Sequence, residues 1–191
     1  MEYAKFIVSG QDKKVLAGIK NTLTAYGHIF VGYSGSPSNV LRHVRGIQPD
    51  LLIIEAQSDF KELKQALEII DDELLASSIL LLDSRNDEIF EFLRNTKAAT
   101  YIAKPVFEEV LLQIVDLSLN NFLRIKEYEN KVKQLNNTLE SRKIIEKAKW
   151  VLVEQEGYSE AGAYELIRKK SRDNRMTMRD IADAIILTRL K

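Results

Sequence analysis

Residues 49–55 are Pro49-Asp50-Leu51-Leu52-Ile53-Ile54-Glu55, with four consecutive aliphatic side chains between two acidic ones. A strand that is apolar on both faces is typical of a parallel sheet covered by helices on both sides. Segments with helical spacing separate this run from four others of strand length. Residues 1–115 are therefore predicted to form an α/β doubly wound domain. The other strand-like runs are Phe6-Ile7-Val8, Ile29-Phe30-Val31, Ile79-Leu80-Leu81-Leu82 and Tyr101-Ile102.

Local motifs in this predicted domain match a known pattern. Residues 49–55 correspond to its third strand, and residues 79–84, which end at Ser84, correspond to its fourth. The fifth strand is matched by Tyr101-Ile102-Ala103-Lys104-Pro105, with a lysine-proline pair at its end. By these motifs the domain resembles the receiver of response regulators, which has a flavodoxin-like fold. The resemblance implies an acidic pair that holds magnesium, an aspartate that accepts phosphate, a hydroxyl residue and a lysine.

Most of these functional positions are altered in this sequence. Ser9 and Gly10 stand in place of the acidic pair, Glu55 in place of the phosphate acceptor and Asp83 in place of the hydroxyl, whereas Lys104 is kept. Without the acidic pair a divalent cation lacks oxygen ligands, so phosphoryl transfer loses its charge neutralisation. We therefore expect a pseudo-receiver that does not autophosphorylate with small phosphodonors.

Two interpretations of Glu55 remain open at this point. Its carboxylate could contact Lys104 and imitate a phosphorylated state, or it could be a polar residue tolerated at a strand end. Asp83 could also pair with Lys104, which would make that lysine structural. Asp12 lies where the first helix begins, so we expect it to cap that helix rather than to bind a metal ion.

A long helix is predicted after the receiver, because no proline or glycine occurs between Pro105 and residue 153. Within it, apolar residues recur at steps of three and four, the spacing of a two-stranded coiled coil. We expect a coiled-coil linker over residues 116–138 that forms a parallel homodimer. The alternative is that this stripe packs against its own chain. The predicted dimerisation residues are Ile125, Tyr128, Val132, Leu135 and Leu139.

Residues 139–191 are predicted to form an all-α three-helix bundle. Gly157 suits the end of its first helix, and Ser159 can cap the second. Thr177 and Asp180 have the spacing of a capping box at the start of the third. The segments Arg142 to Lys149, Ser159 to Ala163 with Leu166 and Arg168, and Asp180 to Ile186 make this region similar to the ANTAR domain of transcription antitermination regulators.

The ANTAR resemblance implies binding to paired hairpin loops in the leader of nascent mRNA, which prevents a terminator from forming. Trp150 departs from the small residue that the family has at this position, and it could be a core residue, a dimer contact or a platform for base stacking. A ligand-sensing regulatory protein could replace phosphate as the input. Our other hypothesis is a DNA-binding regulator with a helix-turn-helix-like output domain.

Charge supports a polyanionic partner for the second half of the chain. Residues 1–115 hold 12 basic and 16 acidic side chains, a net charge of −4, whereas residues 116–191 hold 16 and 12, a net charge of +4. The alternative is that the basic run is only a solvated helix face. Ala163 matches a small position of the ANTAR pattern that would let RNA approach, and the alternative for this residue is ordinary helix packing. The predicted RNA-binding residues are Lys149, Tyr158, Ala163, Tyr164, Arg168, Lys169, Arg172, Arg175 and Arg179.

The residue composition also argues against several classes of protein function. The chain has no cysteine and two separate histidines, so we expect neither a metal site nor a cofactor. It shows no nucleophile next to a base and no glycine-rich phosphate loop, so we do not expect an enzyme. No apolar stretch approaches the ~18 residues of a membrane span, and no signal peptide is recognisable, so we expect a cytoplasmic protein.

Overall fold

The computed structural model describes residues 3–35, 37–56, 60–83 and 87–189. Ser84, the last residue of the predicted fourth strand motif, and Leu190 and Lys191 of the predicted helical bundle lie outside the described residues. The chain divides into two compact units, residues 1–127 and residues 128–191.

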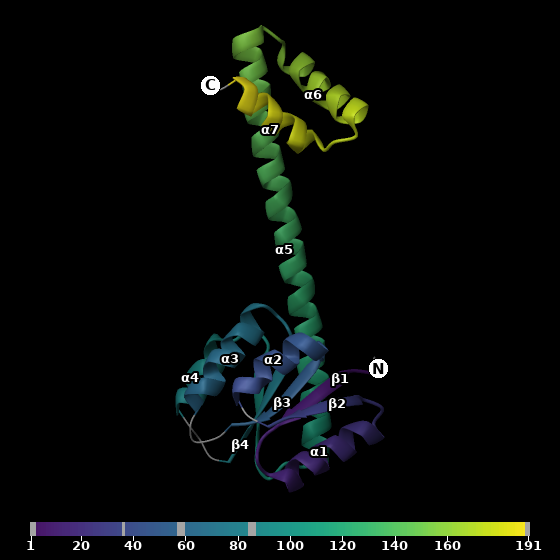
Figure 1. Ribbon diagram of the computed structural model, residues 1–191, viewed down its shortest axis with the longest axis vertical. Coiled ribbons are helices and arrows are strands. Elements are labelled where there is room, and N and C mark those ends of the chain that lie inside the picture. The colour runs from purple at the N-terminus through teal and green to yellow at the C-terminus, as the bar shows by residue number, and fades with distance from the viewer. Residues whose placement is uncertain (1–2, 36, 57–59, 84–86, 190–191) are drawn as a thin grey trace. The chain divides into compact units, whose positions relative to one another are not determined.

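The first unit contains one five-stranded sheet (Figure 1). All its strand pairs are parallel, in the order β2-β1-β3-β4-β5. Every residue of β3 and β4 is buried, as expected of apolar strands that are covered on both faces. The five predicted strands are confirmed, with the bounds β1 (Lys5–Ser9), β2 (Ile29–Ser34), β3 (Leu51–Glu55), β4 (Ser77–Leu82) and β5 (Ala99–Ala103).

Helices cover both faces of this sheet, which confirms the doubly wound fold. One apolar core lies beneath α2 (Pro37–Ile47), α3 (Phe60–Asp72) and α4 (Asp87–Asn95). The other core lies beneath α1 (Lys13–Ala25) and the first turns of α5 (Glu108–Glu156). The order reverses at β1 and β3, so their carboxyl ends flank the crevice in which such sheets place a functional site.

The second unit is built from the end of α5 together with α6 (Glu160–Asn174) and α7 (Met178–Arg189) (Figure 1). The three helices share one apolar core. Its most buried members are Ala148, Val151, Leu152, Ala163, Ile167, Ile181, Ala182 and Ile185. This agrees with the helical bundle that the sequence predicts.

The predicted helix boundaries of this unit are confirmed. Gly157 follows α5 with a φ of 69°, a conformation that glycine adopts without steric cost. The Ser159 hydroxyl accepts a hydrogen bond from the Gly162 amide at 3.1 Å. At the start of α7 the Asp180 amide donates to the Thr177 hydroxyl at 3.1 Å, and the Thr177 amide donates to the Asp180 carboxylate at 3.2 Å. These reciprocal bonds form a capping box.

Candidate functional site

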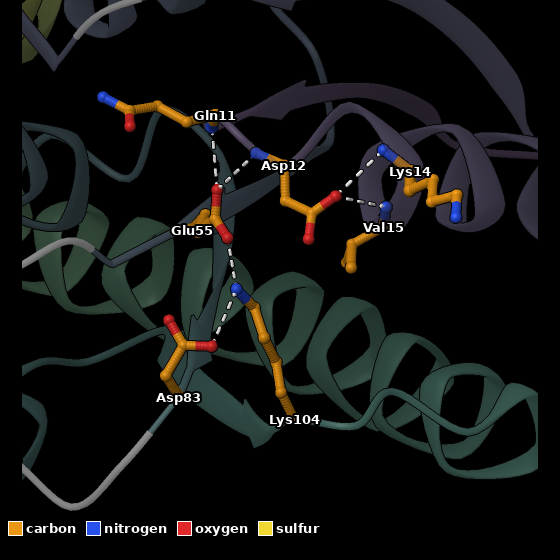
Figure 2. A network of polar contacts seen from close by, with 7 residues as sticks. All are labelled: Gln11, Asp12, Lys14, Val15, Glu55, Asp83 and Lys104. Atoms are coloured by element: carbon orange, nitrogen blue, oxygen red, sulfur yellow. Dashed lines mark hydrogen bonds and ion pairs between the residues drawn. The ribbon is translucent and has the colours of Figure 1, made fainter.

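The carboxylate of Glu55, at the end of β3, binds three groups from other elements (Figure 2). Its Oε2 accepts hydrogen bonds from the backbone amides of Gln11 at 2.7 Å and Asp12 at 3.0 Å. Its Oε1 forms an ion pair with Nζ of Lys104, just after β5. Glu55 therefore connects the loop after β1 with the segment that follows β5.

Gly10 makes this arrangement possible. A Cβ at that position would lie 2.6 Å from Cβ of Glu55 and 2.7 Å from its Oε2. The backbone φ of Gly10 is 154°, which side chains rarely adopt. The loss of a side chain where receivers carry an acidic residue thus leaves the space that the longer carboxylate of Glu55 fills.

Asp83 provides a second carboxylate for Lys104. Its Oδ1 lies 3.1 Å from Nζ of Lys104, and its side chain is 70% exposed, whereas that of Lys104 is 14% exposed. Both expected partners of Lys104 are therefore present. The pair with Glu55 is the better shielded from water, so it dominates the electrostatics of Lys104.

Hydrogen bonding determines the charge state of this pocket. Burial by itself raises the pKa of Glu55, but the hydrogen bonds from Lys104 and from the Asp12 and Gln11 amides outweigh it and lower that pKa. For Lys104 burial acts to lower the pKa, and the hydrogen bonds with Glu55 and Asp83 raise it above its ordinary value. The two side chains are thus a charged pair at neutral pH.

The remaining residues of the altered receiver pocket have structural partners. The Ser9 hydroxyl donates to the Ser34 carbonyl oxygen at 2.8 Å. Asp12 caps α1, as predicted, because its carboxylate accepts from the amides of Lys14 and Val15 at 2.9 and 3.1 Å. Among the described residues, no three His, Cys, Asp or Glu side chains come together as metal ligands would.

A basic face runs along α6 in the second unit. Tyr164, Arg168 and Arg172 follow one another at steps of four residues, so they share one side of the helix. All three are exposed, and Lys169 lies beside them. Arg168 contacts Glu165 at 3.2 Å, but both side chains are more than half exposed, so this pair contributes little and leaves the guanidinium accessible.

Two arginines continue the basic face beyond α6. Arg175 caps the helix in the left-handed conformation, with φ of 53° and ψ of 36°. Arg179, in the first turn of α7, is exposed and lies 4.0 Å from Asp183. Left-handed backbone is unfavourable for a residue with a Cβ, by roughly 1 kcal/mol.

Lys149 and Ala163 are placed differently from the other predicted RNA contacts. Nζ of Lys149 binds carboxylates of Glu146 at 2.9 Å and Glu160 at 2.8 Å, and its side chain is only 10% exposed. The hydrogen bonds to Glu160 and Glu146 raise the pKa of Lys149. Ala163 is fully buried in the core. The structure therefore favours helix packing for Ala163, and it makes Lys149 a link between α5 and α6.

The aromatic residues of this unit reach solvent. Tyr158 is 39% and Tyr164 is 42% exposed, so both rings have a free surface. Trp150 is 58% exposed, so the interpretation of Trp150 as a core residue is wrong. A bulky residue at this position does not disturb the bundle because the side chain lies outside the core.

The predicted coiled-coil stripe is solvent-exposed for most of its length. Tyr128, Val132, Leu135 and Leu139 are between 53% and 63% exposed. The first predicted member, Ile125, instead packs against the cluster of Leu74, Ala98 and Phe122 in its own unit. Ile125 is thus partly buried, because α5 still packs against the receiver at that point, and its place in a dimer seam stays a prediction.

Residues 133–186 match the family model described as the ANTAR domain. This part of the chain is thus an ANTAR domain, and a domain with the receiver fold precedes it. It is similar to the transcriptional regulatory protein PdtaR of Mycobacterium tuberculosis (strain CDC 1551 / Oshkosh), with 24% identity over 184 residues, 96% of this chain and 90% of the relative.

Solved structures show the receiver fold. The signal receiver domain of a modulated diguanylate cyclase from Desulfovibrio desulfuricans G20 has a TM-score of 0.56 at 14% identity, covering 63% of this chain and 97% of that one. A CheY-like receiver domain from Methanospirillum hungatei JF-1 has a TM-score of 0.55 at 18% identity, covering 64% of this chain and 98% of that one.

Sequence reasoning missed the amides of Gln11 and Asp12 as partners of Glu55, and the two carboxylates that bind Lys149. For the partners of Glu55, the usable signal was that a glycine at position 10 and a longer acidic side chain at position 55 occur in the same sequence. Backbone donors leave no pattern in a sequence, and long-range ion pairs require the fold to be known.

Proposed function

We propose that this chain is an RNA-binding transcription antiterminator that binds hairpins in nascent mRNA and keeps a terminator from forming. The observation behind this proposal is the exposed basic face of α6 in a unit that matches the ANTAR domain. The relative PdtaR is described as a transcriptional regulatory protein, which agrees with a role in transcription.

The basic face has the chemistry that folded RNA requires. Guanidinium groups bind phosphate oxygens, and their flat surfaces also stack on unpaired bases. Tyr164 is one helical turn from Arg168, so an unstacked loop base could lie on the ring while the arginine binds the adjacent phosphate. Tyr158 offers a second exposed ring near the start of α6.

The proposal includes a homodimer. The exposed side chains of Tyr128, Val132, Leu135 and Leu139 form an apolar stripe on α5, and a second copy would bury it. Two copies present two ANTAR domains, which suits a pair of hairpins, because linking two binding events raises the overall affinity well above that of one.

In this proposal the receiver acts without phosphate. The place of the phosphate acceptor is taken by a glutamate that is already engaged by Lys104 and two amides. Input would then come from a ligand-sensing partner protein or from the level of the protein itself.

No helix in the described part of the chain is long and apolar enough to cross a membrane.

Binding of the full-length chain to RNA and DNA tests this function. We expect a tandem-hairpin RNA to bind more tightly than either single hairpin or duplex DNA of random sequence. Replacing Arg168 and Arg172 with glutamine should weaken RNA binding and lower the salt dependence by about one counterion for each phosphate group that is no longer bound. Equal, salt-sensitive binding to RNA and duplex DNA would contradict the proposal that the chain recognises RNA hairpins, and it would favour the DNA-binding hypothesis.

A further inference from the structure

Lys149 differs in its surroundings from the exposed basic residues of the ANTAR domain. Its side chain is 10% exposed, and its Nζ lies 2.9 Å from a carboxylate oxygen of Glu146 and 2.8 Å from one of Glu160. Glu146 is three residues earlier on α5, whereas Glu160 is the first residue of α6. The hydrogen bonds to Glu160 and Glu146 raise the pKa of Lys149, so its ammonium group is charged at neutral pH. Lys149 thus joins α5 to the first turn of α6 through a charged pair.

The two carboxylates make the neighbourhood of Lys149 unfavourable for phosphates. One positive and two negative side chains give this group a net charge of −1. A phosphate oxygen could reach Nζ of Lys149 only by displacing Glu146 or Glu160, and the displaced carboxylate would then repel the phosphate. A direct contact with RNA is therefore unfavourable for a lysine in this position.

The connection between α5 and α6 does not itself fix the direction of α6. It consists of residues 157–159. A Cβ at Gly157 would meet nothing within 4 Å, so no neighbouring side chain packs against this position. The Ser159 hydroxyl accepts from the Gly162 amide within α6, so it caps the helix without attaching it to α5. The ion pair of Glu160 with Lys149 makes that attachment.

Glu160 begins the row of residues that continues into the basic face. Tyr164, Arg168 and Arg172 follow it at steps of four residues. If α6 turned by about 20° about its own axis, a side-chain tip ~6 Å from that axis would move by about 2 Å. Hydrogen bonds to phosphate oxygens tolerate only about 0.3 Å. The rotation of α6 therefore determines whether Arg168 and Arg172 can bind RNA together.

The apolar core restrains this rotation less sharply than an ion pair does. Ala163 and Ile167 are the fully buried residues of α6. Their apolar contacts have no preferred direction, whereas a hydrogen bond between charged groups requires a particular distance and angle. The pair of Lys149 with Glu160 thus adds the angular restraint that the core lacks.

We propose that Lys149 is a positioning residue for RNA binding, which acts through Glu160 to hold α6 at the rotation that presents Arg168 and Arg172 to hairpin RNA. Lys149 itself does not contact the RNA. This inference rests on the proposed function, and it replaces the direct RNA contact that the sequence predicts for Lys149.

The sign of the effect at Glu160 separates the two roles. Glu160→Gln removes a negative charge from the RNA-binding unit, so a purely electrostatic role predicts tighter RNA binding. The positioning role predicts that tandem-hairpin RNA binds about threefold to tenfold more weakly to full-length Glu160→Gln, and likewise to Lys149→Met. Glu165→Gln is the matched control, because Glu165 is more than half exposed on α6 and pairs with Arg168. It should leave the affinity unchanged or raise it.

An unstructured RNA gives a second measurement. A run of uridines binds positive charge without a fixed spacing of groups, so Lys149→Met should leave its affinity nearly unchanged. The salt dependence of hairpin binding should also stay the same. Arg168→Gln should instead weaken the binding of both RNAs and lower the salt dependence. The proposal would be overturned if Lys149→Met behaved like Arg168→Gln, or if Glu160→Gln bound hairpins more tightly than the wild type.

The double variant tests whether the two residues act through one contact. Lys149→Met combined with Glu160→Gln should weaken hairpin binding no more than either change alone, because the same ion pair is lost in each case. Losses that add would show that Lys149 and Glu160 act independently, which contradicts the proposal.

Hydrogen exchange without RNA follows the position of α6 directly. Both variants should exchange the amides of residues 162–167 faster than the wild type, whereas Glu165→Gln should not. Glu160 is 80% exposed, so its variant should fold even if Lys149→Met does not. Unchanged exchange in Glu160→Gln, or unchanged hairpin affinity in a protein that prefers hairpins to the uridine run, would overturn this inference alone. A wild type without that preference would overturn the proposed function, and the positioning role with it.

Discussion

A methyl group at Gly10 would lie 2.6 Å from Cβ of Glu55, closer than two carbon atoms approach without bonding. The side chain of Glu55 occupies that space and reaches the amides of Gln11 and Asp12. These two departures from the receiver pattern are therefore coupled, because the smaller residue makes room for the longer one. The result is a pocket in which the buried Glu55 carboxylate is paired with Lys104, and the exposed Asp83 is a second partner of that lysine.

Replacing Gly10 with alanine should destabilise the receiver by about 1 to 3 kcal/mol, because the new methyl group forces Glu55 away from its donors. Calorimetry of the full-length protein measures this as a lower unfolding temperature of the first unit. Gly18→Ala is the matched control, since a Cβ there meets nothing within 4 Å in the middle of α1. It should stabilise the fold by about 0.5 to 1 kcal/mol. Equal effects of the two changes would contradict the coupling.

Acid should weaken the receiver through Glu55. Its folded pKa is lowered, so it binds protons more weakly than the unfolded chain does, and it stabilises the fold above the unfolded pKa of about 4.5. That stabilisation is lost as pH falls through the lowered pKa. Glu55→Gln should cost about 1 to 3 kcal/mol at pH 7, with a difference from the wild type that shrinks below pH 4.5. A difference that is constant with pH would show that the charge of Glu55 contributes nothing.

Small phosphodonors should not modify this receiver. Incubation with acetyl phosphate and Mg²⁺ should leave the intact mass unchanged, because Ser9 and Gly10 supply no carboxylate for the cation. Glu55→Asp restores the usual acceptor residue but should not restore modification, since the metal ligands are still missing. Mass spectrometry of both proteins decides this, and a phosphorylated carboxylate at position 55 of the variant would show that the acidic pair is dispensable.

The strands and helices were predictable because burial and helical spacing leave periodic patterns, as in the fully apolar β3 and the caps at Ser159 and Thr177. The ion pair of Lys104 with Glu55 was one of the alternatives that the sequence allowed. The burial of Lys149 was not predictable, because its two carboxylate partners come together only when α5 and α6 pack. A charged residue in a motif does not reveal whether it faces solvent.

Arg175→Gly should separate stability from RNA binding. The residue caps α6 with a φ of 53°, where glycine is favoured, so the change should stabilise the second unit by up to about 1 kcal/mol. It also removes one positive charge from the basic face, so RNA affinity should fall and its salt dependence should decrease. Thermal unfolding followed at Trp150 and RNA titrations at two salt concentrations measure both effects. Tighter RNA binding by the glycine variant would exclude Arg175 from the interface.

The proposed function as a whole is tested most directly by crosslinking the full-length protein to nucleic acid in its native cell and sequencing the RNA and DNA that are crosslinked to it. We predict enrichment of mRNA leaders in which two hairpins precede a terminator, and loss of that enrichment when Arg168 and Arg172 are replaced together. Recovery of promoter DNA, or of no leader above background, would contradict the account.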